Sequence, residues 1–114
     1  MYDPNRTQQC FICLIRKVRN PPAISLSEEE LHLRHRAFVQ SLSDRGLLFS
    51  SGPARDDNDA HEGSIIILRV PTRTDAERLL GEDPNIVYVQ RRAEIVPWQR
   101  RWFEDEPIPA PKRR

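Results

Sequence analysis

The chain has 114 residues, enough for one domain, and its apolar fraction of 38% with a mean hydropathy of −0.66 is low for a self-sufficient core. No stretch approaches the roughly 20 apolar residues of a membrane span, and residues 1–9 lack signal-peptide features, so we expect a cytoplasmic protein with no membrane partner. The 18 basic and 17 acidic residues leave a net charge of +1, which argues against nucleic acid as a partner.

The first predicted element is a strand over residues 10–15, preceded by a polar, flexible tail over residues 1–8. Its sequence CFICLI is apolar and rich in β-formers, and the charges and paired prolines of residues 16–22 end it. Cys10 and Cys13 form a C-x-x-C, but residues three apart in a strand point to opposite faces, and no second cysteine pair is present. We therefore expect buried structural cysteines rather than a metal or redox site.

The most complete helix signals lie between Ser27 and Gly46. Ser27 and Glu30 form an S-x-x-E capping box, and Gly46 is typical of the position after a helix C-terminus. Spacings of four, three and four place four residues on one core-facing stripe: Leu31, His35, Phe38 and Leu42. His35 is thus a polar residue in an apolar stripe. His32 lies three residues before it, but no third ligand has a fitting spacing, so we expect no metal.

A hairpin with a long connection is predicted next. Residues 47–51 form a short apolar strand, and residues 64–70 form a stronger one. The connection between them, residues 54–63, contains several aspartates and His61 but lacks the ligand spacing of a calcium loop. We expect a solvated loop without a bound cation.

A second helix follows between Thr72 and Gly81. Two capping pairs fit its start, Thr72 with Asp75 and Thr74 with Glu77, and the sequence does not choose between them. Its apolar side is narrow, so we expect it to bury a single stripe.

Asp83 and Pro84 suit the cap and first position of one further helical turn, because aspartate accepts from free backbone amides and proline needs no donor there. Residues 86–96 are predicted to be the last strand, which Pro97 is expected to end. Residues 99–114 are charged and rich in proline, and we expect a tail.

The element order strand, helix, strand, strand, helix, strand predicts a ferredoxin-like α+β fold, with an antiparallel sheet and both helices on one face. The first and third strands are apolar on both sides, as expected when neither face meets water. Two helices cover only one face, so a second copy is expected on the other. The prediction is a homodimer that forms a dimeric α+β barrel, with higher assembly left open.

Several features together resemble the YciI-like, or YCII-related, family of dimeric α+β barrel proteins, and the resembling domain covers residues 9–98. They are His35 in the first helix, the segment GLLFSSGP, the acidic loop, the strand GSIIILRV, the Asp83-Pro84 pair, and the last strand running into Pro97-Trp98. The resemblance implies a catalytic His35 and Asp83 in a pocket between helices and sheet. Asn85 departs from the family, where an aromatic residue is frequent, so the substrate is expected to differ.

These residues favour a small enzyme without a cofactor, in which His35, oriented by Asp83, is a general acid or base on a small organic acid or aromatic compound. Ser51, Gly52 and Pro53 are candidate substrate-binding residues, because a glycine after a strand allows close approach by a ligand. The alternatives are an ordinary turn at these residues and a non-catalytic dimer that binds or scaffolds a small molecule. A monooxygenase is a third option.

Overall fold

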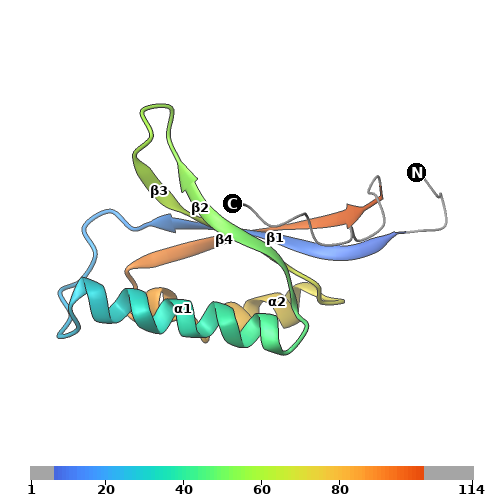
Figure 1. The fold of residues 1–114 in the computed structure, drawn as a ribbon, viewed down its shortest axis with the longest axis horizontal. Helices are drawn as coiled ribbons and strands as arrows, with labels where there is room; N and C mark the ends of the chain where they lie inside the picture. The colour runs from blue at the N-terminus through green and yellow to red at the C-terminus, as the bar shows by residue number, and fades with distance from the viewer. Residues whose placement is uncertain (1–6, 102–114) are drawn as a thin grey trace, which may run out of the picture.

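The computed structural model describes residues 7–101, which form an α+β fold with the predicted order of elements (Figure 1). The elements are β1 Gln8–Lys17, α1 Glu28–Asp44, β2 Leu48–Arg55, β3 His61–Leu68, α2 Arg73–Leu80, α3 Pro84–Val87 and β4 Arg91–Arg100. Most of the two predicted tails, residues 1–6 and 102–114, lies outside the described residues. Within the described range, no helix is long and apolar enough to cross a membrane.

The four strands form one antiparallel sheet in the order β2-β3-β1-β4. This arrangement is ferredoxin-like, and the predicted fold class is confirmed. Figure 1 shows α1 and α2 on the same side of the sheet, with the β2–β3 hairpin extending away from them. The helices divide this face, since α1 lies nearer to β2 and α2 nearer to β4.

The helix ends are set by the local hydrogen bonds that the sequence predicts. Ser27 caps α1 by accepting from the backbone N–H three residues later, at 3.0 Å. Thr72 rather than Thr74 caps α2, because its Oγ1 accepts from the Asp75 N–H at 3.1 Å. Gly46 follows α1 with a φ of 72°, a left-handed conformation that glycine adopts without strain.

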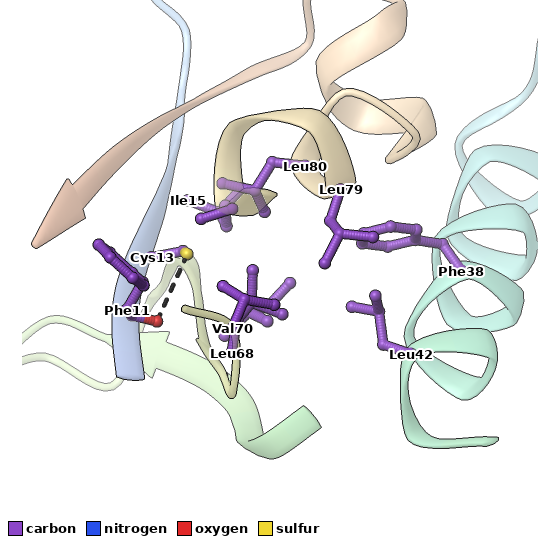
Figure 2. Packing of buried hydrophobic residues seen from close by; sticks show 11 residues of the cluster. Phe11, Cys13, Ile15, Phe38, Leu42, Leu68, Val70, Leu79 and Leu80 are labelled. Carbon is purple, nitrogen blue, oxygen red and sulfur yellow. Dashed lines mark hydrogen bonds between the residues drawn. The ribbon is translucent and has the colours of Figure 1, made fainter. Parts of the chain in front are cut away.

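The core lies between the helices and one face of the sheet (Figure 2). Its buried members are Phe11, Cys13, Ile15, Phe38, Leu42, Ile66, Leu68, Val70, Ala76, Leu79 and Leu80. Cys13 and Cys10 are both free thiols with no exposed surface, so their predicted burial is confirmed. The Cys13 thiol donates to the Phe11 carbonyl oxygen at 3.7 Å, and burial raises the pKa of Cys13 to about 12.

The last strand differs from its prediction at both ends. It begins at Arg91, because the preceding residues form α3 and a turn in which Val89 has a φ of 57°. The expectation that Pro97 ends the strand is wrong, since Pro97 pairs with Phe11 and the strand continues to Arg100. β4 lies at an edge of the sheet, with β1 as its neighbour. Proline has no backbone N–H to donate, and an edge strand tolerates it because one side of the strand has no partner strand to bond.

The other side of the sheet has no helix over it in the described part of the chain (Figure 1). Large apolar side chains alternate with the core residues along three strands and form what we call the open face: Ile12, Leu14, Ile65, Ile67, Val96 and Trp98. Val96 is 39% exposed and Trp98 is 36% exposed. At one end, the Arg100 guanidinium stacks over Phe49 of β2 at 4.1 Å, although two strands separate β2 from β4.

Candidate functional site

The structure brings together the histidine and the aspartate that the resemblance marks as a pair. Nδ1 of His35, in α1, lies 3.0 Å from Oδ1 of Asp83, which immediately precedes α3. The Asp83 side chain is completely buried and the His35 side chain is 15% exposed. The two residues are 48 positions apart in the chain, so only the packing of α1 against α3 creates this contact.

The Oδ1 of Asp83 makes a second, local hydrogen bond. Its Oδ1 also accepts from the Asn85 N–H at 3.0 Å, which makes Asp83 the predicted cap of α3. Its other oxygen, Oδ2, is buried and has no hydrogen-bond partner among the described residues. A buried acceptor without a partner costs about 1–3 kcal/mol.

A cavity of about 540 Å³, partly open to solvent, adjoins the His35 side chain. It lies between α1 and the β2–β3 hairpin, with contributions from α3 and β4. Its lining contains all three predicted substrate-binding residues together with His35: His32, His35, Arg36, Val39, Gln40, Ser43, Leu48, Ser51, Gly52, Pro53, His61, Ser64, Ile66, Asn85 and Arg91.

Helix α1 contributes side chains both to the core and to the lining of this cavity. The cavity residues His32, Arg36, Val39 and Ser43 recur at spacings of four, three and four, one position along from the core stripe. His35 lines the cavity and also lies close to the core, with its ring centroid 6.3 Å from that of Phe38. The helix therefore presents His35 at the boundary between apolar packing and an accessible space.

Burial lowers the pKa of two basic side chains that line the cavity, Arg91 and His61. Burial lowers the pKa of the Arg91 guanidinium, and the nearby Asp83 carboxylate acts in the opposite direction. Slight burial also lowers the pKa of His61, and the positive charges of Arg91, Lys17 and Arg55 act in the same direction. A backbone hydrogen bond at Gly63 opposes these effects on His61.

The described residues contain no group of three or more histidine, cysteine, aspartate or glutamate side chains able to hold a metal ion. His32 and His35 both line the cavity. His61 lines it from the other side, as part of β3 rather than of a solvated loop.

Several residues of this cavity are not among the predicted site residues, and three of them, Arg91, His61 and Arg36, carry or can carry positive charge. Arg36 follows from spacing, because it belongs to the stripe next to the core stripe. Arg91 has no such local signal, since the sequence does not distinguish it from Arg92 before the start and register of β4 are known.

No family model matches the chain, and no curated protein matches it. Among solved structures, one that is similar is 5-chloro-2-hydroxyhydroquinone dehydrochlorinase from Burkholderia phenoliruptrix AC1100, in complex with 2,5-dihydroxybenzoquinone. The two chains are 18% identical with a TM-score of 0.48, and the match covers 85% of this chain and 96% of that one. The resemblance to YciI-like proteins stays a prediction.

Proposed function

We propose that this chain is a cofactor-independent enzyme in which His35, held by Asp83, is a general acid or base on a small organic acid or aromatic compound. Isomerase, lyase or dehalogenation reactions suit a pair of residues that moves protons. The observation that carries this proposal is the 3.0 Å contact between His35 Nδ1 and Asp83 Oδ1 beside a partly open cavity.

The contact gives the two ring nitrogens of His35 different tasks. An ionised carboxylate only accepts hydrogen bonds, so the Nδ1–H of His35 donates to Asp83. Nε2 is then the nitrogen that takes a proton from the substrate or returns one to it. The buried negative charge of Asp83 stabilises the imidazolium that forms when Nε2 is protonated.

Burial supports a role for Asp83 beyond capping α3. Ser27 and Thr72 cap the other two helices from exposed positions, which shows that a cap in this fold needs no burial. Asp83 is fully buried, and its Oδ2 has no partner among the described residues. Orientation of His35 accounts for this arrangement, whereas capping alone does not.

The proposed substrate-binding residues are Ser51, Gly52 and Pro53, which line the cavity from β2. Ser51 offers a hydroxyl that both donates and accepts. Apart from Gly52 and its two chain neighbours, no described residue has an atom within 4 Å of the place where a Cβ on Gly52 would be, so the backbone there is open to approach.

We also propose that the working form is a homodimer in which two open faces pack together to form the α+β barrel. The open face holds six large apolar side chains, namely Ile12, Leu14, Ile65, Ile67, Val96 and Trp98. Burying even five such side chains contributes on the order of 10 kcal/mol, comparable with the net stability of a whole domain. Sedimentation of the full chain at several concentrations tests this, and a folded monomer at all of them would contradict it.

The acid/base proposal is tested by solvent deuterium exchange, which reports proton transfer even when the product is unidentified. The full chain is incubated in D2O with a panel of small organic acids and aromatic compounds, and deuterium incorporation and product formation are followed by mass spectrometry. We expect His35→Gln to lower the exchange rate by about 100- to 10,000-fold, as is typical of lost general acid–base catalysis.

Asp83→Asn and Glu82→Gln form a matched pair for this experiment. The two carboxylates are neighbours in sequence, but Glu82 is exposed and pairs with Arg45 on the surface. We expect only Asp83→Asn to lower the exchange rate. Full activity of folded His35→Gln would reject the proposal, and a compound that binds the wild type without any exchange or turnover would support the non-catalytic ligand-binding dimer instead.

A further inference from the structure

Arg91 lines the cavity but has no task in the proton transfer proposed above. It is the first residue of β4, where Ala93 and Ile95 pack against the core. Because alternate residues of a strand share a face, Arg91 also lies on the helix side of the sheet. The strand therefore presents its guanidinium from the same side as His35 and α1.

The ionisable side chains that line the cavity are all basic. It contains two arginines and three histidines, and no aspartate or glutamate: the five are His32, His35, Arg36, His61 and Arg91. Asp83 is the neighbouring carboxylate and its charge acts on Arg91, but its Oδ1 is occupied by His35 and the Asn85 amide, and its Oδ2 makes no hydrogen bond to Arg91 or to any other described residue. A cavity with this lining favours a negatively charged ligand.

The guanidinium of Arg91 makes no hydrogen bond or ion pair with any described residue. Other arginines pair with carboxylates on the surface, as Arg45 does with Glu82 and Arg78 with Asp75. Arg91 is partly buried, and arginine stays protonated in proteins, so its charge is partly desolvated without a close partner. A ligand anion would supply that partner.

We infer that Arg91 binds the carboxylate of a small aromatic carboxylate substrate in this cavity. The planar guanidinium matches a carboxylate through two parallel N–H···O bonds, which a point charge does not offer. Apolar lining suits the ring of such a molecule, and it comes from Val39, Leu48, Pro53 and Ile66. The reaction of the ligand at His35 rests on the proposed function, whereas its binding at Arg91 does not.

The test uses benzoate as the probe and benzamide as its neutral analogue of the same shape. Binding to the full chain is measured by isothermal titration calorimetry for the wild type, Arg91→Gln, Arg91→Lys and Arg92→Gln. Arg92 is the matched control, because it is the next residue of β4, is exposed and lies outside the cavity lining. Circular dichroism establishes that each variant is folded.

We expect the wild type to bind benzoate more tightly than benzamide. Arg91→Gln should weaken benzoate binding about 10- to 100-fold, the effect of losing a charge-assisted hydrogen-bonded pair. Arg91→Lys should retain part of the affinity, because it keeps the charge and loses the fork. Arg92→Gln should stay within about twofold of the wild type, since it removes an equal but solvent-screened charge.

Equal affinity for benzoate and benzamide would overturn the inference, as would equal losses in Arg91→Gln and Arg92→Gln. Absence of benzoate binding to the wild type up to about 10 mM would also overturn it, since a paired guanidinium in a cavity should exceed that affinity. His35→Gln separates this inference from the proposed function. If His35→Gln loses deuterium exchange but still binds benzoate, both the proposed function and this inference are supported. If it keeps both exchange and binding, the acid/base role of His35 is contradicted and the binding role of Arg91 is not.

Discussion

The two faces of the sheet use the same strands but are completed differently. On β3, Ile66 points to the helices and has no exposed surface, whereas its neighbour Ile67 points to the open face and is partly exposed. On β1, Cys13 lies in the core, and Cys10 points to the other side, where the charge of Arg100 acts on its thiol. The helix side is closed by the chain itself except at the cavity, while the open face has no helix over it within residues 7–101.

The two cysteines give the largest predicted contrast between these faces. Burial raises the pKa of Cys13 from 9.0 to about 12, so its thiolate fraction should fall about 1,000-fold. Burial also raises the pKa of Cys10, but Arg100 and Arg69 act in the opposite direction. In alkylation at pH 8 with peptide mapping, Cys10 should react before Cys13. Reaction of Cys13 first in the native protein would contradict this difference between the faces.

Truncation in the core should lower stability regardless of protein concentration. Ile66→Ala removes a side chain with no exposed surface and should lower the free energy of unfolding by about 2–5 kcal/mol. Urea denaturation followed by circular dichroism measures this loss. A loss below about 1 kcal/mol would indicate that the helix side is less closely packed than the structure shows.

Truncation of Ile67, the next residue of β3, tests the open face in the same way. Ile67→Ala should lower stability by about 1–2 kcal/mol, less than Ile66→Ala, because the side chain is only partly buried within one chain. If two open faces pair, this loss should grow at protein concentrations where the wild type is dimeric. Ile67→Glu should shift sedimentation toward a folded monomer. A concentration-independent loss with an unchanged sedimentation coefficient would argue against pairing through this face.

The smallest predicted effect concerns the charge of the cavity. The pKa of His61 is lowered from 6.5 by burial and by Arg91, Lys17 and Arg55, with an opposing effect from Gly63, so Arg91→Gln should raise it toward 6.5. NMR titration of the histidine ring measures this change, and Arg92→Gln should leave the pKa unaltered. An unchanged His61 pKa in Arg91→Gln would show that the Arg91 charge does not act on His61.

Stability linked to His61 has a definite sign. Its folded-state pKa is lowered, so the folded protein binds the proton less well than the unfolded chain does. The contribution of neutral His61 to the free energy of unfolding is fully present above about pH 6.5, the pKa of an unperturbed histidine. It is lost as the pH falls below 6.5 and through the lower pKa of His61 in the folded protein. Arg91→Gln should therefore weaken the acid sensitivity that arises from His61.

Local signals in the sequence are enough for the elements and their caps. Ser27 and Asp83 cap helices as predicted, and Thr72 is the one of two possible caps that the structure selects for α2. Each of these hydrogen bonds joins residues two or three positions apart. The errors occur where the decision is not local. Val89 is predicted in a strand but lies in a turn, and Pro97 continues the edge strand because only one neighbour, β1, pairs with it.

The candidate site could be predicted only in part. His35 stands out because it interrupts an apolar stripe, and Asp83 because a resemblance pairs the two; the structure places them 3.0 Å apart. Ser51 is expected at a strand end, but β2 continues to Arg55, so the structure places Ser51 inside the strand and in the cavity lining. Arg91 and His61 are missed as site residues, since their position depends on the register of β4 and on the extent of β3.

The sequence by itself determined the order of elements, the caps of α1 and α3 and the alternation of apolar residues, because propensity, capping and periodicity act over a few neighbouring residues. Only the tertiary structure decided which residues meet. The His35–Asp83 contact spans 48 positions, and the cavity draws on two helices and three strands. Such contacts depend on where the helices pack on one face of the sheet. Burial of the whole core sets those positions, and no short segment of the sequence encodes them.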